Sequence, residues 1–179
     1  MRNAILLLVA AFCSLAADDP ARPSPPLSIQ RLNGPEVRLT QFRGKVVALT
    51  FILTTCSHCQ ELTQVLNRLA PQFVPRGVQF VECAINSDAA TAMQEFLRRF
   101  QPQFPVGWTS EAVARSYVRI PITGGRPLYV PHMVFLDRRG IVRGDFSGET
   151  GFFTNSEANI RTELEKLLKA DANPSPVRP

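Results

Sequence analysis

A pair of cysteines separated by two residues is the part of this sequence best suited to chemistry. The run Cys56-Ser57-His58-Cys59 follows residues 46–53, an almost unbroken stretch of apolar and β-branched residues that is typical of a buried strand. After Cys56 the apolar residues recur at helical spacing. We therefore expect the pair where a strand ends and a helix begins, which is where open α/β sheets carry their functional sites.

Each residue of this run has an expected role. Cys56 is the candidate nucleophile, because it lies nearest the free N–H groups of the helix, whose partial positive charge stabilises a thiolate. Cys59, one turn further on, is expected to be buried and to resolve a mixed disulfide formed at Cys56. A protonated His58 would stabilise the thiolate and so make the couple more oxidising. Ser57 is expected to contact the substrate. Because this chemistry needs only two sulfurs, we expect no cofactor and no resident metal.

Other interpretations of the cysteine pair stay open. A static disulfide or a zinc site would want further cysteines or well-spaced histidines, and beyond residue 17 the sequence adds only Cys83, His58 and His132. Cys83 lies in an apolar run and is interpreted as a core residue. Cys56, Cys59 and His132 are nevertheless ligands suited to Cu(I), so a periplasmic copper-handling protein is one alternative function.

The two ends of the chain indicate export. Residues 1–17 have a basic start, an apolar run and small residues before Asp18, which is the layout of a cleavable signal peptide. Residues 18–26 are rich in proline and are predicted to be a linker without packed structure, and residues 171–179 to be a disordered tail. One domain, residues 27–170, remains. We expect secretion across the inner membrane into the periplasm, with membrane contact only through the N-terminal segment if it stays uncleaved.

Charge and cysteine content narrow the function further. The net charge of +5 is modest, and the basic residues are scattered without a stripe of interleaved aromatic residues, so nucleic-acid binding is not expected. The cysteines that follow residue 17 are too few, and odd in number, for a disulfide-stapled scaffold. In an exported protein they favour chemistry.

The order of periodic segments predicts an α/β fold. Strands are expected at residues 36–40, 46–53, 78–85, 106–109, 133–137 and 141–146, and helices at 56–73, 88–100, 111–117 and 156–169. This alternation predicts βαβ units in a central mixed sheet that is mainly parallel, with a terminal antiparallel hairpin that turns at Gly140. Each helix has one apolar stripe, so helices are expected on both faces of the sheet, in a three-layer sandwich.

Three segments resemble the thioredoxin-fold redoxins of the TlpA-like group of thiol–disulfide oxidoreductases. They are residues 44–51 (GKVVALTF), the CxxC run, and residues 130–137 (VPHMVFLD). The likeness covers residues 27–168 and implies a thioredoxin-like domain. It also implies that Pro131 is a cis-proline facing Cys56 and that Val130 presents its backbone to the substrate. Residues 88–100 and the strand after them are similar to the helix–strand insertion of TlpA-like and peroxiredoxin-like members.

The sequence departs from this family pattern at several positions. Thioredoxins carry a buried acid where Thr50 stands and a tryptophan where Thr55 stands, and TlpA-like reductases often carry an acid where Leu62 stands. The missing acids count against a reductant with a proton relay. Peroxiredoxins resemble one another in the pattern P-x-x-x-T-x-x-C, and here Leu53 takes the threonine position. This mismatch counts against a peroxiredoxin-like thiol peroxidase, which stays a second alternative function because peroxiredoxins share the fold.

The function that these features favour is thiol–disulfide exchange. We expect an exported oxidoreductase that exchanges disulfides with the thiols or disulfides of other exported proteins through Cys56 and Cys59. A redox partner protein is expected to restore its active form.

Overall fold

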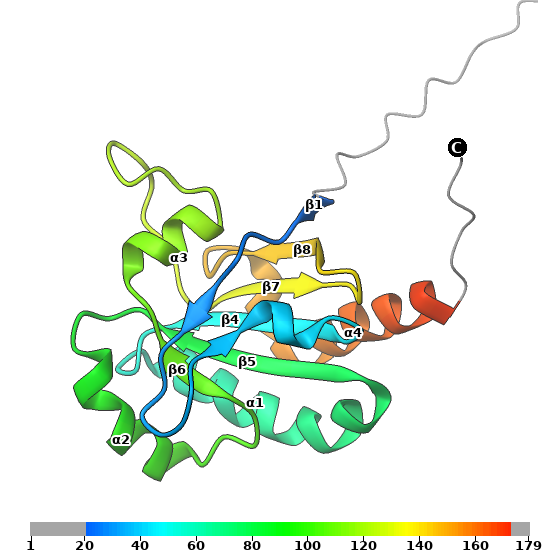
Figure 1. The fold of residues 1–179 in the computed structure, drawn as a ribbon, viewed down its shortest axis with the longest axis horizontal. Helices are drawn as coiled ribbons and strands as arrows, with labels where there is room; N and C mark the ends of the chain where they lie inside the picture. Colours follow the sequence, from blue (N-terminus) through cyan, green and yellow to red (C-terminus); the bar gives the residue numbers. More distant parts are fainter. Residues whose placement is uncertain (1–20, 173–179) are drawn as a thin grey trace, which may run out of the picture.

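A computed structural model describes residues 21–172 (Figure 1). A six-stranded sheet has the strand order β1-β8-β7-β4-β5-β6, and β2 and β3 form a separate pair. The strands are β1 (Arg22–Pro23), β2 (Ser28–Ile29), β3 (Val37–Arg38), β4 (Val46–Ile52), β5 (Val78–Ala84), β6 (Val106–Trp108), β7 (His132–Leu136) and β8 (Ile141–Phe146). The helices are α1 (Ser57–Phe73), α2 (Ala89–Phe100), α3 (Glu111–Tyr117) and α4 (Ser156–Ala172), with 3₁₀ helices η1 (Leu39–Phe42), η2 (Val74–Arg76) and η3 (Gly151–Asn155).

Strand β4 lies at the centre of the sheet, and all of its residues are buried. It pairs in parallel with β5 and antiparallel with β7, so that Thr50 lies opposite Glu82 on one side and Met133 on the other. A strand covered on both faces explains the unbroken apolar run in the sequence. It also fixes the point at which the chain leaves the sheet and enters α1.

Two apolar layers cover the sheet, one on each face. Helices α1, α2 and α4 pack on the first face, around Ala48, Ile52 and Phe135. Helix α3, η1 and the strands β2 and β3 pack on the second face, around Leu49 and Val134. In Figure 1 α1 and α2 lie at the bottom of the view, and α3 lies at the upper left, beside β7 and β8. The predicted three-layer α/β sandwich with an inserted helix–strand element, α2 and β6, is confirmed.

Helix α1 is held by one apolar stripe. Its buried residues include Leu62, Leu66, Leu69 and Phe73, as their helical spacing predicts. Pro71 lies in the last turn, and the chain then reverses through η2 at Gly77, whose φ of 89° is the left-handed conformation that glycine tolerates. The stripe presses the first turn of α1, which carries the cysteines, against the end of β4.

Three expectations about the fold are wrong in part. Residues 21–26 are not an unpacked linker, because Arg22 and Pro23 pair with β8 and Arg22 is 8% exposed. The sheet is not mainly parallel, because β7, β8 and β1 all pair antiparallel with their neighbours. The expected disordered tail begins too early, because α4 continues to Ala172. The expected signal segment, residues 1–17, lies outside the described residues.

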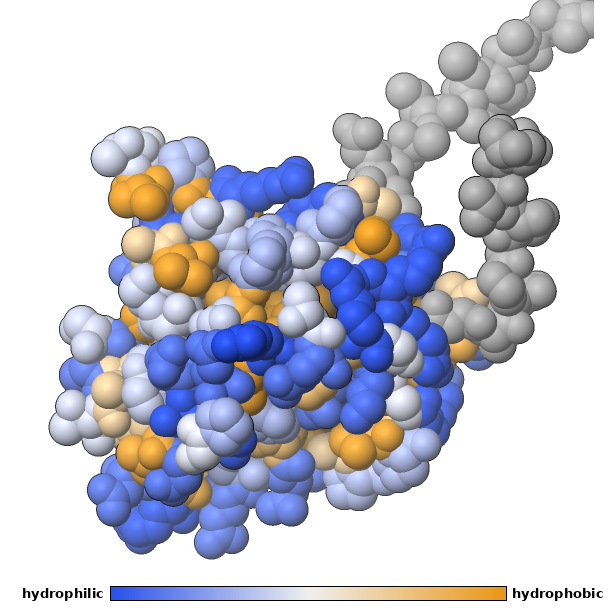
Figure 2. Space-filling model, in the orientation of Figure 1, coloured by the Kyte–Doolittle hydropathy of each residue, from blue (hydrophilic) through white to orange (hydrophobic). Residues whose placement is uncertain are grey.

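The surface of the domain is mainly polar on the face shown in Figure 2, where hydrophobic residues form separate small groups among hydrophilic ones. Within residues 21–172, none of the helices has the length and apolar character needed to cross a membrane.

We predict that Leu66→Ala lowers the free energy of unfolding by about 2–5 kcal/mol, because Leu66 is fully buried between α1 and the sheet. Urea unfolding followed by circular dichroism measures this loss. Val113→Ala is the matched control, since Val113 is 43% exposed and its truncation should change stability by less than about 0.5 kcal/mol. Equal losses in the two variants would contradict the assigned core.

Candidate active site

The loop between β4 and α1 is fixed by a side chain from the neighbouring strand. Asn86, which follows β5, accepts a hydrogen bond from the backbone N of Thr54 (3.1 Å) and donates one to the Thr54 hydroxyl (2.9 Å). Gln60 in α1 donates to the Thr54 carbonyl at 2.8 Å, and the backbone N of Cys56 donates to the Leu53 carbonyl at 3.1 Å. The loop therefore presents Cys56 in one defined position.

Cys56 takes the N-cap position of α1. Its sulfur accepts a hydrogen bond from the backbone N–H of Cys59, with 3.4 Å between the two atoms. The residue is partly exposed, and all three cysteines of the described chain are free thiols. The first turn of α1 therefore places an N–H donor against the Cys56 sulfur, at a position that a substrate can reach.

Cys59 has the opposite environment. It is fully buried in the first apolar layer. Burial, and after it a hydrogen bond with the Cys56 sulfur, raises the pKa of the Cys59 thiol far above its usual value. The structure thus confirms the predicted difference in burial between the two sulfurs. With its raised pKa, Cys59 stays a neutral thiol unless a nearby base accepts its proton.

A buried carboxyl group lies beneath the cysteines. Glu82 in β5 is fully buried, and burial raises its pKa from an ordinary 4.5 to about 8. It faces the same apolar layer as Cys59, because its neighbours Phe80 and Ala84 at period-2 spacing belong to that layer. An ionised Glu82 in turn raises the pKa of Cys59 by charge repulsion. Ionisation of Glu82 therefore disfavours ionisation of Cys59, and the site favours at most one negative charge on the pair.

A hydroxyl group joins these two residues. Thr63 Oγ1 lies 3.0 Å from the Cys59 carbonyl oxygen and 3.0 and 3.1 Å from the two Glu82 oxygens. A hydroxyl has one proton and can donate to only one acceptor at a time. A protonated Glu82 can donate to Thr63 while Thr63 donates to the Cys59 carbonyl, whereas an ionised Glu82 must take the Thr63 proton. The hydrogen bond from Thr63 to an ionised Glu82 lowers the pKa of that carboxyl group and so opposes the larger effect of burial.

Sequence reasoning missed Glu82, Thr63 and Asn86. The expected position of a buried acid, Thr50, lies directly opposite Glu82 in the sheet, so the acid stands on the neighbouring strand. The signal was an acidic residue inside the mainly apolar run of residues 78–85, because a carboxyl group is seldom fully buried without a partner or a role. The inference that this chain lacks a buried acid near the pair is wrong.

His58 and Ser57 lie on the outer side of the first turn of α1. The His58 side chain is 81% exposed, and its Nδ1 lies 3.7 Å from Glu61 Oε2, whose side chain is 75% exposed. Ser57 is exposed beside it. Because both side chains of the His58–Glu61 pair face water, solvent weakens their electrostatic effect on neighbouring groups.

A groove runs along the active-site end of the molecule beside α1. The Val130–Pro131 peptide bond is cis, as the family resemblance implies. A cavity of about 270 Å³ is lined by His58, Glu61, Leu62, Val130, Pro131, Gly148, Thr150, Phe153, Thr154 and Ser156. Gly148 allows a close approach here, since a Cβ on it would stand 2.8 Å from the Val130 carbonyl oxygen. The structure therefore brings His58, Val130 and Pro131 to one cavity.

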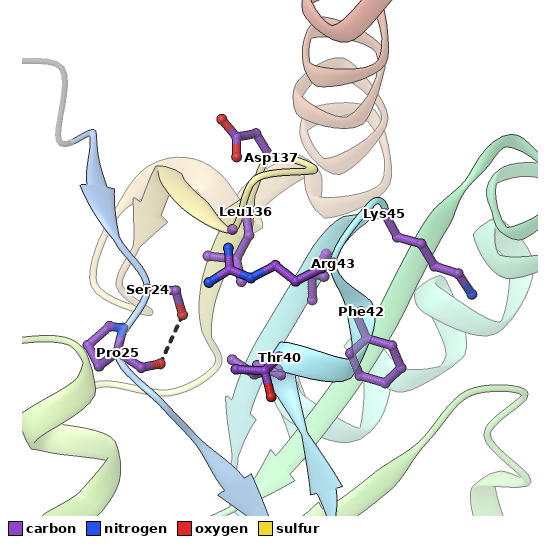
Figure 3. A pocket seen from close by; sticks show the side chains of 11 residues that line it. Ser24, Pro25, Thr40, Phe42, Arg43, Lys45, Leu136 and Asp137 are labelled. Atoms are coloured by element: carbon purple, nitrogen blue, oxygen red, sulfur yellow. Dashed lines mark hydrogen bonds between the residues drawn. The ribbon is translucent and has the colours of Figure 1, made fainter.

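A second hollow lies at the other end of β4 and β7 (Figure 3). It is lined in part by Ser24, Pro25, Arg43, Lys45 and Asp137 and offers only about 10 Å³, roughly the space of one water molecule. Its size and its distance along the strands from Cys56 exclude it as a substrate site.

Two other candidate residues lie away from the cysteine pair. Cys83 and His132 sit on the second face of the sheet, where Cys83 is fully buried and His132 Nε2 lies 2.6 Å from Asp145 Oδ1. Burial raises the pKa of the Cys83 thiol. Across residues 21–172, no three side chains of His, Cys, Asp or Glu come together as a metal site would require.

Comparison with known proteins agrees with this geometry. The Redoxin family model matches residues 16–162. The chain is 31% identical to the thiol-disulfide oxidoreductase ResA of Geobacillus kaustophilus, over 93% of this chain and 94% of that protein. It is 28% identical to ResA of Geobacillus thermodenitrificans, with the same coverage of both chains. A crystal structure of a thioredoxin-family thiol:disulfide interchange protein from Chlorobium tepidum TLS superposes with a TM-score of 0.65, at 21% identity over 83% of this chain and 99% of that one.

A thioredoxin-like fold with a CxxC pair at the start of α1 defines a thiol–disulfide oxidoreductase. The chain belongs to the Redoxin family, within which it is a TlpA-like thiol–disulfide oxidoreductase.

We predict that iodoacetamide modifies Cys56 alone in the native reduced protein. Cys56 is partly exposed, whereas Cys59 and Cys83 are fully buried and have raised pKa values, and alkylation requires an accessible thiolate. Mass spectrometry of peptides after short exposure measures the three sites separately. Denatured protein is the control and should react at all three. Modification of Cys59 as fast as Cys56 would contradict the assigned roles.

We also predict that Glu82 makes stability depend on pH. Because its pKa rises from 4.5 in the unfolded chain to about 8 in the folded protein, the folded state keeps a proton that the unfolded state releases. This contribution is fully present below about pH 4.5 and is lost as the pH rises toward 8. Glu82→Gln should remove this decline, whereas the exposed Glu61→Gln should keep it. Urea unfolding of the reduced proteins across this range is the measurement, and parallel curves for wild type and Glu82→Gln would contradict it.

Proposed function

We propose that this oxidoreductase exchanges disulfides with exported proteins outside the cytoplasm, with Cys56 as nucleophile and Cys59 as resolving cysteine. The observation that carries the proposal is the contrast between the two sulfurs. Cys56 is partly exposed and accepts an N–H at the start of α1, and Cys59 is a fully buried neutral thiol. A sulfur that starts exchange must be reached by substrate, and a sulfur that ends it must only reach its neighbour.

The reaction balances in two steps. In the reducing direction the Cys56 thiolate attacks one sulfur of a substrate disulfide, and the other substrate sulfur leaves as a thiolate. Cys59 then loses its proton and attacks Cys56, which releases the second substrate thiolate and forms the Cys56–Cys59 disulfide. The substrate is reduced by two electrons, which the two cysteines lose. Oxidation of a substrate dithiol runs through the same steps in reverse.

Glu82 is the group that we assign to the proton of Cys59. A base works best when its pKa lies near the working pH, and the pKa of Glu82 is about 8. When an ionised Glu82 accepts the proton of Cys59, the negative charge moves from the carboxylate to the thiolate. The number of buried charges therefore stays the same. This assignment supplies the acid that the family pattern places elsewhere.

Val130 and Pro131 are proposed to dock the substrate chain. They line the same cavity as His58 and Glu61 of α1, and Leu62 and Phe153 give that cavity an apolar wall. An extended substrate segment lying in the cavity would bring its cysteine to the start of α1. Ser57 and His58, which are exposed there, would contact it.

The periplasm is the proposed compartment, supported by the layout of residues 1–17 as a signal peptide. Partners there would be the thiols or disulfides of other exported proteins and a protein that restores the redox state of Cys56 and Cys59.

We predict that Cys59→Ser, produced from the full-length chain, accumulates mixed disulfides with exported proteins through Cys56. Without the resolving sulfur the intermediate can no longer be released internally. Non-reducing electrophoresis of the periplasmic fraction, followed by mass spectrometry, identifies the adducts. Cys56→Ser is the matched control and should form none.

Three other outcomes would overturn the proposal. Adducts confined to cytoplasmic proteins would contradict the compartment. An absence of adducts with stoichiometric Cu(I) binding by the wild type would favour a copper-handling protein, and rapid peroxide reduction by the isolated protein would favour a peroxidase.

A further inference from the structure

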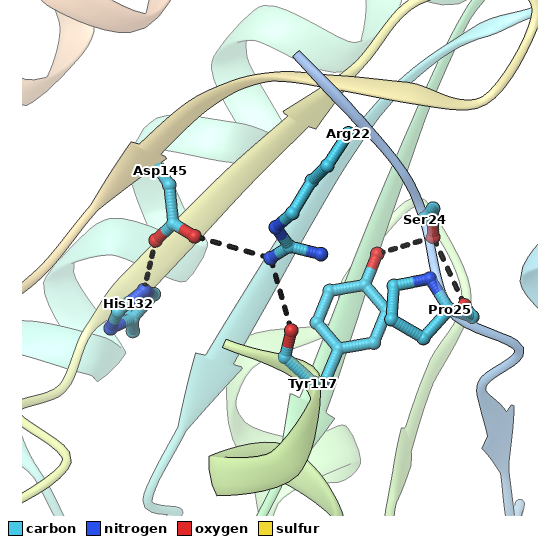
Figure 4. A network of polar contacts seen from close by, with 6 residues as sticks. All are labelled: Arg22, Ser24, Pro25, Tyr117, His132 and Asp145. Atoms are coloured by element: carbon cyan, nitrogen blue, oxygen red, sulfur yellow. Dashed lines mark hydrogen bonds and ion pairs between the residues drawn. The ribbon is translucent and has the colours of Figure 1, made fainter. Parts of the chain in front are cut away.

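A polar network lies on the sheet face opposite the cysteine pair and crosses three strands (Figure 4). His132 Nε2 in β7 lies 2.6 Å from Asp145 Oδ1 in β8, and Asp145 Oδ2 lies 3.4 Å from Arg22 Nη2 in β1. The same Arg22 nitrogen donates to the Tyr117 carbonyl at the end of α3, at 3.0 Å. The Tyr117 hydroxyl closes the network, 2.7 Å from Ser24 Oγ.

The network is buried among apolar residues. Only 5% of the His132 side chain and 9% of the Arg22 side chain are exposed, and 25% of Asp145. Val134 and Leu136, which alternate with His132 along β7, belong to the apolar layer of this face. Burial also raises the pKa of the Tyr117 hydroxyl to about 12, so that it stays neutral.

Stability alone gives little reason for such a network. Among the residues that the structure describes, Arg22 Nη1 and His132 Nδ1 are buried without a hydrogen-bond partner. Buried polar atoms of this kind cost free energy, and well-packed apolar side chains often serve as well as a buried ion pair. Hydrogen bonds and ion pairs are directional, so each contact in the network fixes the position of one strand or helix end relative to another.

The network and the chain after β8 both contact the start of β7. His132 directly follows the cis peptide bond between Val130 and Pro131, and Asp145 holds its ring. Gly148, three residues after Asp145, packs against the Val130 carbonyl. Asp145 in β8 and Gly148 after it therefore contact the residues on the two sides of Pro131, His132 and Val130.

We propose that His132, Asp145 and Arg22 are positioning residues for the substrate-docking segment. They hold Val130 and Pro131 in place beside α1, and Arg22 makes the N-terminal strand β1 part of the docking apparatus. This inference rests on the proposed docking role of Val130 and Pro131. Because the network lies on the other face of the sheet from Cys56 and Cys59, it acts on docking of a peptide chain and leaves the chemistry of the sulfurs unchanged.

The test compares a docked substrate with one too small to dock. The docked probe is a synthetic peptide closed by a single disulfide, and the small probe is 2-hydroxyethyl disulfide, which has no peptide backbone. Excess dithiothreitol returns the Cys56–Cys59 disulfide to the dithiol form after each turnover, so that the steady-state rate above the uncatalysed background can be measured with either probe. The variants are His132→Leu and Arg22→Met, each paired with a conservative change, His132→Gln or Arg22→Lys, that keeps a donor for Asp145.

We expect His132→Leu and Arg22→Met to raise the apparent KM for the peptide about tenfold, with kcat within about twofold of wild type. The conservative partners should recover most of that loss. The rate with 2-hydroxyethyl disulfide and the midpoint potential of the cysteine pair should stay at their wild-type values in all four variants.

Folded variants with an unchanged peptide KM would overturn the inference, and so would a parallel loss with both probes. If His132→Leu does not fold, Arg22→Met against Arg22→Lys decides the question by the same readouts. A wild-type protein that exchanges disulfides with neither probe would instead overturn the proposed function itself.

Discussion

The site depends on a helix that begins where a fully buried strand ends. The backbone N–H of Cys59 meets the Cys56 sulfur at 3.4 Å because β4 delivers the chain to that point and the apolar stripe of α1 holds the first turn against the sheet. The different surroundings of the two sulfurs follow from this junction. The outer sulfur meets water and the positive end of the helix, and the inner sulfur meets the core. Two identical side chains thereby acquire different tasks.

Below the junction, a second constraint governs where negative charge can reside. Cys59 and Glu82 share one apolar layer, burial raises the pKa of both groups, and an ionised Glu82 raises the pKa of Cys59 further. Thr63 contacts the Cys59 carbonyl and the Glu82 carboxyl group, and its hydrogen bond to Glu82 opposes part of the effect of burial on the pKa of that acid. On the opposite face of the sheet, buried polar side chains are instead joined across strands, from Arg22 through Asp145 to His132. One face thus carries a buried acid in the same layer as the inner cysteine, and the other joins strand ends by polar contacts.

Much of this could be predicted from the sequence. The buried run of β4, the helical stripe after Cys56 and the order of strands and helices determine the fold and place the pair, because these are local patterns with known periods. Glu82 escaped prediction because its role depends on pairing with β4, a contact between residues distant along the chain. The packing of β1 escaped for the same reason, since a proline-rich segment gives no sign that Arg22 will find a carboxylate in β8.

The most direct test of the account is a titration of the mature protein in glutathione redox buffers, with free thiols counted at each potential. We expect one two-electron transition in which Cys56 and Cys59 lose their thiols together while Cys83 stays reduced throughout. Its midpoint would rank the protein between oxidants near about −120 mV and reductants near about −270 mV. Independent loss of the two thiols, or glutathione adducts in place of a mutual disulfide, would contradict the division of roles between the exposed and the buried sulfur.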